Sequence, residues 1–235
     1  MSECIEIPGG DLRSRPDPYA DPTSLEFRFR VKRFELVQAL IEKSLSEKGR
    51  VRILDIGGTE YYWRIGNDFL AANRGRIRIT LLNIDVDPVD DPGLFDAMVG
   101  DGSDPGLLAG ETFDLVHSNS VIEHVGDWQH MERFAENTRR LAKYYYVQTP
   151  NYWFPYEPHF RFPGFQYLPK STRVALMMRY KLGFFPRVND WEEARDVVDH
   201  HTLVSVRQVR SLFGDAHVLF EKVAGLNKSI IAMRG

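Results

Sequence analysis

The spacing of hydrophobic residues changes from a helical to a strand period near Gly49. Before it, apolar side chains recur every three or four positions, which places them on one face of a helix. They are Phe27, Val31, Phe34, Val37, Ile41 and Leu45. Thr23 and Glu26 have the spacing of a capping box, in which each side chain satisfies the other's free backbone N–H. The pattern predicts an N-terminal helix over 23–49.

Short apolar runs of strand length follow this helix. They are residues 51–56, 78–85, 97–101, 113–118 and 144–149. The segments 60–73 and 128–143 between them have helical character, although Gly66-Asn67 interrupts the first. Strands that alternate with helices predict a parallel sheet covered on both faces.

The C-terminal segment predicts a different connection. Ser205 and Gln208 form a second capping box, for a helix that runs to Phe213. Two strand-like runs, 217–223 and 229–233, are joined by Ala-Gly-Leu-Asn-Lys, which is too short for a parallel crossover and favours an antiparallel hairpin. The predicted fold class is therefore α/β: a Rossmann-like, doubly wound, mostly parallel sheet with a C-terminal antiparallel hairpin.

The length of 235 residues suits a single domain. Residues 1–22 are rich in Pro, Gly and Asp and predict a flexible lead-in, so the domain is expected over 23–235. Inside it, residues 150–201 form an insertion dense in aromatic and proline residues. Such an insertion can wall a substrate pocket or form a small separate core, and the two interpretations are compatible with each other.

Composition narrows the function classes. The net charge of −3 argues against a basic nucleic-acid binder. No apolar run reaches the roughly 18 residues of a membrane span, so no integral membrane association is expected. Cys4 is the single cysteine, which rules out a disulfide framework and favours the cytoplasm. The basic cluster Arg28, Arg30, Lys32 and Arg33 is interpreted as a solvated helix face, with an anionic ligand or lipid surface as the alternative.

Glycines and acids stand where the central strands are predicted to end, and ligands of open parallel sheets bind beyond those ends. The segments are Asp55-Ile56-Gly57-Gly58-Thr59, Asp85, Gly100-Asp101-Gly102 and Ser118-Asn119. Between Asn83 and Asp127 there is no lysine or arginine. Such a surface is a poor pyrophosphate site and suits a ligand with hydroxyl groups, an amino group and positive charge.

From about Arg50 onward the chain resembles the class I S-adenosylmethionine-dependent methyltransferases that act on small molecules. Residues 51–58 are similar to that family's glycine motif, 82–85 to its ribose-acid strand and 99–102 to its adenine-contact motif. Residues 113–125 resemble the stretch after the fourth strand, where Glu-His-Val recurs in relatives of the ubiquinone-type O-methyltransferases.

This resemblance implies S-adenosylmethionine as the cofactor and a role for each matched residue. The methionine part would face the turn made by Asp55, Gly57, Gly58 and Thr59. Asp85 would accept hydrogen bonds from the ribose hydroxyls. Asp101 would accept one from the adenine amino group, and the Gly102 backbone would donate one. The backbone near Ser118 and Asn119 would hold the methionine amine.

The glycine motif departs from the family pattern Gly-x-Gly-x-Gly. Here it reads Gly57-Gly58-Thr59-Glu60-Tyr61, without the second and third glycines. Thr59 is therefore expected in a backbone region that glycine normally occupies. The departure predicts altered, weakened or lost cofactor binding.

Methyl transfer from a sulfonium needs an aligned acceptor, exclusion of water and, for a hydroxyl acceptor, removal of a proton. His124 and His159 are the candidate bases, against a structural role for each, and Glu157 is a second choice. No metal site is expected, because the neighbours His200 and His201 cannot both face one ion from a strand and no His-x-x-x-His pair occurs.

The leading hypothesis is methyl transfer to a small-molecule acceptor, with no nucleic-acid partner; the sequence leaves the acceptor and the oligomeric state open. The alternative is a non-catalytic binding protein with the same fold. A nicotinamide-dependent oxidoreductase or epimerase is disfavoured, because no tyrosine is followed by a lysine four residues later.

Overall fold

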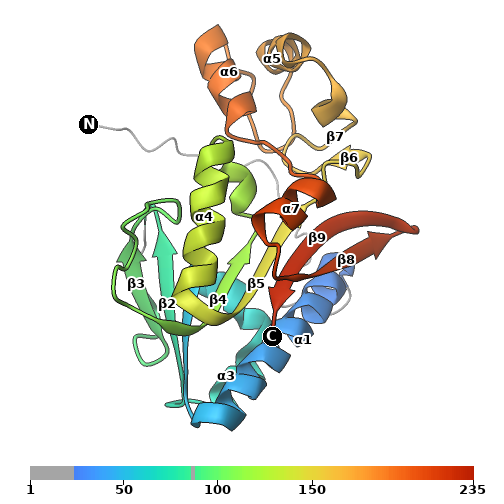
Figure 1. Ribbon diagram of the computed structural model, residues 1–235. Coiled ribbons are helices and arrows are strands. Elements are labelled where there is room, and N and C mark those ends of the chain that lie inside the picture. Colours follow the sequence, from blue (N-terminus) through green and yellow to red (C-terminus); the bar gives the residue numbers. More distant parts are fainter. Residues whose placement is uncertain (1–23, 86–87) are drawn as a thin grey trace.

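The computed structural model describes residues 24–85 and 88–235 (Figure 1). Its seven-stranded sheet has the order β3-β2-β1-β4-β5-β9-β8. The strands are β1 (Val51–Ile56), β2 (Ile77–Asn83), β3 (Phe95–Val99), β4 (Phe113–Asn119), β5 (Ala142–Pro150), β8 (His217–Val223) and β9 (Leu226–Arg234). β1 to β5 are parallel, and β9 runs antiparallel to both β5 and β8. The predicted fold class is confirmed.

The C-terminal hairpin differs from its prediction in the turn. Ala224 and Gly225 alone join the strands, so β9 begins at Leu226 rather than at Ser229. Both turn residues have positive φ, 49° and 81°. This left-handed backbone matches the twist of the flanking strands, which is why two residues suffice.

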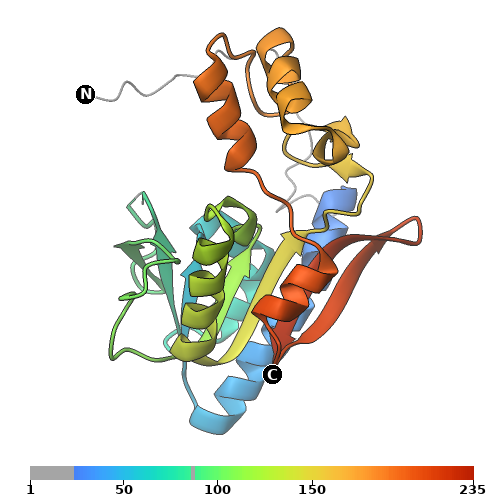
Figure 2. The same ribbon diagram turned by 45° about the horizontal axis from the view of Figure 1, so that its top comes forward.

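Helices cover both faces of the sheet (Figures 1 and 2). One face carries α1 (Leu25–Lys48), α2 (Glu60–Trp63), the 3₁₀ turn η1 (Arg64–Gly66) and α3 (Asn67–Ala72). The other carries α4 (Trp128–Leu141) and α7 (Val206–Leu212). Ile53 packs on the first face and Leu54 on the second, as strand alternation requires. Within the described parts of the chain, no helix combines the length and the apolar character that a bilayer crossing needs.

The caps of α1 and α7 test the two capping predictions. The α1 cap is Ser24, whose hydroxyl accepts from the Phe27 backbone N–H at 3.0 Å, so the prediction of Thr23 was wrong by one residue. Thr23 itself, like the predicted lead-in and Cys4, lies outside the described residues. The capping box of Ser205 and Gln208 is confirmed.

The predicted helix over 60–73 is broken into α2, η1 and α3. A Cβ atom on Gly66 would lie 2.0 Å from the Phe34 ring of α1, so the missing side chain lets α1 pack closely here. The break falls at Gly66-Asn67, where the sequence interrupts the helical pattern.

The aromatic insertion forms a small core of its own beyond the carboxyl ends of the parallel strands (Figures 1 and 2). Its elements are β6 (Tyr156–Glu157), β7 (Phe162–Pro163), η3 (Phe165–Tyr167), α5 (Lys170–Arg179) and α6 (Trp191–Asp199). Phe160, Phe165, Val174, Met177 and Val198 are buried together in it. The separate-core interpretation of the insertion is therefore confirmed.

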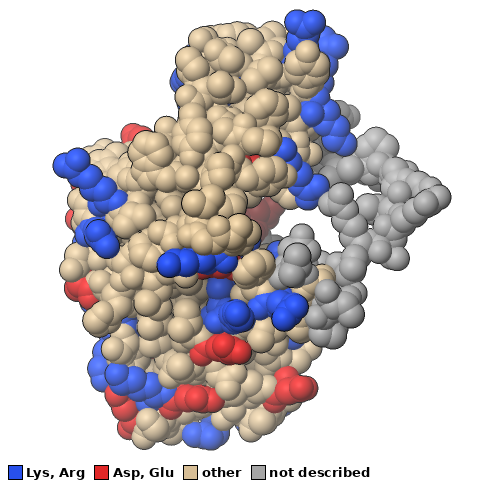
Figure 3. Space-filling model, turned by 90° about the vertical axis from the view of Figure 1, so that its right-hand side faces the viewer, with Lys and Arg blue, Asp and Glu red and all other residues tan. Residues whose placement is uncertain are grey.

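The basic cluster of α1 lies on the side of the β8–β9 hairpin, the side seen in Figure 3. Arg33 is turned inward and pairs with the buried Glu221 of β8 at 3.3 Å. Glu221 also pairs with Lys228 and accepts from the Ser229 hydroxyl. Figure 3 shows acidic side chains beside the basic ones on this face. Arg33 thus has a structural role, unlike the solvated position predicted for it.

Candidate functional site

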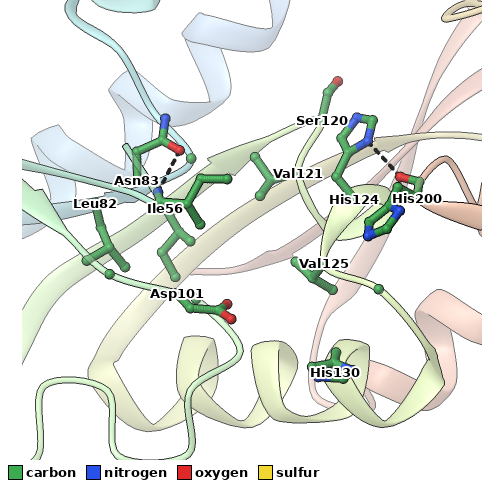
Figure 4. A pocket seen from close by; sticks show the side chains of 15 residues that line it. Ile56, Leu82, Asn83, Asp101, Ser120, Val121, His124, Val125, His130 and His200 are labelled. Atoms are coloured by element: carbon green, nitrogen blue, oxygen red, sulfur yellow. Dashed lines mark hydrogen bonds between the residues drawn. The ribbon is translucent and has the colours of Figure 1, made fainter. Parts of the chain in front are cut away.

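A cavity of about 500 Å³ opens at the carboxyl ends of the central strands (Figure 4). It will be called the main cavity. Its lining comprises Ile56, Gly57, Leu82, Asn83, Ile84, Gly100, Asp101, Gly102, Ser120, Val121, His124, Val125, Gly126, His130 and His200. Its volume lies in the range of small-molecule sites, and its position is where open parallel sheets bind ligands.

A second cavity of about 370 Å³ lies across the end of β2 from the first. The turn residues Gly58 and Thr59 line it, together with Arg64 and Asp85. Asn83, the last residue of β2, borders both cavities. Arg64 is the only lysine or arginine among the described residues that line either cavity.

The three carboxylates expected to contact one cofactor do not line one cavity. Asp101 lines the main cavity and Asp85 the second one, while Asp55 lines neither. Asp85 lies two residues beyond β2, so its position is not fixed by the strand ladder. Asn83, at the strand end itself, takes the place between the two cavities.

Asp55 is buried and serves the interior of the fold. It pairs with His117 in the β1–β4 register, so their side chains lie on the same face of the sheet. His117 Nδ1 donates to Asp55 Oδ1 at 2.6 Å, and Trp63 Nε1 donates to Oδ2 at 2.8 Å. The His117 ring also stacks on Tyr146, 5.5 Å between centroids. Both carboxylate oxygens of Asp55 are therefore used by hydrogen bonds inside the fold, in place of the contact with the cofactor that was expected.

The glycine turn is built differently from the expectation for Thr59. Gly57 has φ +72°, which favours glycine, whereas Thr59 is extended at φ −137° and occupies the N-cap position of α2 without a side-chain capping bond. Gly58 must lack a side chain because its Cβ would lie 1.8 Å from the Asp55 carboxylate. The missing glycine at Thr59 therefore causes no backbone strain.

Ser118 and Asn119 line neither cavity, contrary to the prediction. Ser118 is fully buried, and its hydroxyl donates to the Ile56 carbonyl at 3.0 Å, tying β4 to β1. The cavity lining on this side begins instead at Ser120 and Val121, just after β4 ends.

A cluster of histidines adjoins the main cavity. His124 belongs to the 3₁₀ turn η2 (Ile122–His124) and lines the cavity, whereas His159 of the insertion does not. The two rings meet edge to face at 4.7 Å between centroids. His201, just after α6, packs against both rings at 4.7 and 5.1 Å. The fold thus brings together three histidines that are far apart in sequence.

Burial and mutual contacts shift the pKa values of His124, His159 and the neighbouring Glu123. Burial, with the charge of His159 second, lowers the pKa of His124 to about 4. For His159, burial alone would lower the pKa, but the hydrogen bond to Glu157 and that carboxylate's charge raise it above the ordinary value. Burial raises the pKa of Glu123 to about 7. His124 is therefore the neutral imidazole at the edge of the cavity.

No family model matches the chain. Two uncharacterized proteins from two strains of Mycobacterium tuberculosis are 34% identical to it over 77 residues, which is 32% of this chain. The match spans about a quarter of the length of these relatives, 25%.

Two solved structures resemble the whole fold. The DszA carbon methyltransferase superposes with a TM-score of 0.53 at 13% identity, covering 92% of this chain and 56% of that one. The plantazolicin methyltransferase BamL, crystallised with S-adenosylhomocysteine and a triazolic desmethylPZN analogue, has a TM-score of 0.51 at 8% identity. That match covers 88% of this chain and 87% of the other. The chain has the class I methyltransferase fold.

In this methyltransferase fold, several lining residues carry no motif that sequence reasoning could use. Val121 packs against Gly57, and Val125 lies between the Asp101 and His124 sides of the cavity in Figure 4. His200 lines the cavity and its carbonyl faces His124 Nδ1 at 3.1 Å. Asn83 lies within the 82–85 motif, but the role predicted for that motif was given to Asp85, and Asn83 was not among the predicted site residues.

Proposed function

We propose that this chain transfers the methyl group of S-adenosylmethionine to a small-molecule acceptor. The observation that carries the proposal is the main cavity, with the Gly57 turn and the Asp101-Gly102 loop in its lining. No lysine or arginine occurs among the described residues of that lining, which suits an adenosyl group without phosphates. The methyltransferase fold and the S-adenosylhomocysteine of BamL support the same cofactor.

Asp101 is the proposed acceptor for the adenine amino group. Its Oδ1 accepts from the backbone N–H and the hydroxyl of Ser103, at 2.7 and 2.8 Å. These bonds fix the carboxylate and leave Oδ2 for a ligand donor. Asn137 donates to the Gly102 carbonyl at 2.9 Å, which holds the loop beside α4. A fixed acceptor and a fixed loop favour one orientation of the base.

The rest of the cofactor is proposed to cross Asn83 into the second cavity. There Asp85 would accept from the ribose hydroxyls, and the backbone of Gly58 and Thr59 would face the methionine part. Arg64, the basic side chain of that lining, is the proposed partner of the methionine carboxylate. An extended ligand thus accounts for acids in two adjoining cavities.

His124 is the proposed base for a hydroxyl acceptor. Its Nδ1 faces the His200 carbonyl, so Nδ1 carries the proton and Nε2 keeps a lone pair. His159 lines neither cavity and would act through its contact with the His124 ring. The insertion above these residues would exclude water from the acceptor.

A nicotinamide-dependent enzyme is less compatible with the sheet. Dinucleotide-binding sheets are built from two parallel halves in the order 3-2-1-4-5-6. Here an antiparallel strand, β9, follows β5 at that edge. The non-catalytic alternative is separated by calorimetry, since it predicts no heat on adding S-adenosylmethionine up to millimolar concentration.

Asp101→Ala and Asp85→Ala are each expected to weaken S-adenosylmethionine binding by ~1–3 kcal/mol, because each leaves ligand donors unsatisfied. Isothermal titration calorimetry measures the change. Asp68→Ala is the control, since Asp68 is exposed on α3 and lines neither cavity. Unchanged affinity in Asp101→Ala would contradict the adenine placement, and in Asp85→Ala the ribose placement.

Gly57→Ala is expected to reduce cofactor affinity at least ~10-fold. Separately, it is expected to lower the free energy of unfolding by ~1–2 kcal/mol, the cost of left-handed backbone in a residue with a Cβ atom. The new Cβ would lie 2.4 Å from Val121 Cγ2 and would push Val121 into the main cavity. Gly75→Ala is the matched control, because Gly75 has φ +79° and open space around its Cβ position. Equal affinity in both variants would show that the main cavity does not hold the cofactor.

A further inference from the structure

We propose that Glu123, His124 and His159 form a binding site for a divalent transition-metal ion such as zinc, where the insertion meets the main cavity. One candidate ligand atom of each residue lies within 4.8 Å of the other two. Ligands of one zinc ion at about 2.0–2.1 Å are about 3.4 Å apart in a tetrahedral site, so small side-chain rotations bring the three into range.

The hydrogen bonds around the histidines leave nitrogen lone pairs for an ion. His124 Nδ1 faces the His200 carbonyl at 3.1 Å, and His159 Nδ1 faces Glu157 Oε1 at 2.7 Å. Each Nδ1 therefore carries a proton, and in the neutral form of each ring Nε2 is the free acceptor. Metal-binding histidines are oriented in this way, by a carbonyl or carboxylate on the other ring nitrogen. His201 Nδ1 is held likewise by the Val197 carbonyl at 2.6 Å, and its ring backs the other two.

Both carboxylates of the cluster are buried, and His159 Nδ1 is the partner of Glu157. Glu123 is 0% and Glu157 1% exposed. Glu157 is satisfied by His159 and by the Phe160 N–H, whereas Glu123 Oε1 has no hydrogen-bond partner. Over the described ranges 24–85 and 88–235, no lysine or arginine forms an ion pair with either. Glu123 Oε2 accepts from the Thr149 hydroxyl at 2.9 Å, so Oε1 is the oxygen left for an ion. Buried carboxylates are normally paired or bound to a metal, and a divalent ion would balance Glu123.

The donor set selects the kind of ion. Two imidazoles and one carboxylate are ligands of zinc and similar first-row ions, and zinc enzymes use the same combination with a free position for substrate. Magnesium and calcium prefer oxygen ligands and fit this set poorly. The absence of further cysteines is therefore no obstacle to a metal site.

The position of the site gives the ion a role in the proposed methyl transfer, and this role rests on the proposed function. Because His124 lines the main cavity, the ion lies at its edge. An acceptor hydroxyl bound to it would release its proton to water near neutral pH. The oxygen lone pair would then form the O–CH₃ bond while the S–CH₃ pair returns to sulfur, giving S-adenosylhomocysteine. His124 would be a ligand in this scheme instead of the base.

The test is a zinc titration of the full chain, stripped with a chelator and free of S-adenosylmethionine, by calorimetry at neutral pH. One ion per chain is expected, bound with micromolar or tighter affinity. His159→Ala and Glu123→Gln are each expected to lose ~100-fold in affinity, and Glu157→Gln ~10-fold as an orienting residue. His217→Ala, on exposed β8, and Cys4→Ser are the controls and should bind like the wild type.

No saturable binding by the wild type, or equal binding by His159→Ala and Glu123→Gln, overturns the proposal. If those variants fail to fold, cobalt on the wild type decides: visible ligand-field absorption typical of nitrogen ligands supports the site, and its absence overturns it. S-adenosylmethionine is titrated separately. If the chain binds zinc but not S-adenosylmethionine, the metal site is supported and the proposed function is refuted. If it binds S-adenosylmethionine but not zinc, only the metal site is refuted.

Discussion

Asp55→Ala is expected to lower the free energy of unfolding by ~3–5 kcal/mol, the cost of removing one partner of a buried pair. The substitution leaves His117 Nδ1 and Trp63 Nε1 without their acceptor in the interior. It also removes the carboxylate against which Gly58 packs, so the turn beside the main cavity loses its support. Urea denaturation measures the change in stability.

A double-mutant cycle is the control for this prediction. If the pair acts as one unit, Asp55→Ala with His117→Ala is less destabilising than the sum of the single variants. Asp55→Asn keeps the shape and an acceptor for Trp63, so it should lose less stability than Asp55→Ala. A loss below about 1 kcal/mol in Asp55→Ala, the range of an ordinary hydrogen bond, would contradict the structural role.

His124→Ala is expected to slow methyl transfer by ~10²–10⁴-fold, the usual contribution of a positioned proton-transfer group. The loss is of the same order whether His124 takes the proton or holds the ion that acidifies the acceptor, and the zinc titration separates the two. Formation of S-adenosylhomocysteine with a panel of phenolic, carboxylic and amine acceptors is the measurement. Cofactor affinity should change little, because the proposed adenine contacts lie at Asp101.

His130→Ala provides the comparison. His130 also lines the main cavity, but its Nδ1 is bound to Asp127, the N-cap residue of α4, outside the histidine cluster. Its turnover is expected to stay within about twofold of the wild type. Full activity of His124→Ala with a hydroxyl acceptor would refute its role in proton removal.

The sequence predicted the sheet well because hydrophobic periodicity is local. Each predicted strand is present, and Ser205 and Gln208 cap α7 as expected. The break of the 60–73 segment falls at Gly66-Asn67, where the sequence already interrupts the helical pattern. The close contact of Phe34 of α1 with Gly66 is visible only in the structure, because it depends on a neighbour in space.

For the site, the sequence by itself placed a ligand cavity at the strand ends and named Gly57, Asp101 and His124, all of which line it. Only the tertiary structure decided the rest. The β1–β4 register buries Asp55 against His117, and the position of Asp85 depends on a loop instead of a strand ladder. The histidine cluster is formed by residues from η2, the insertion and the segment after α6. No sequence spacing predicts this cluster, because it depends on how the insertion folds back over the sheet.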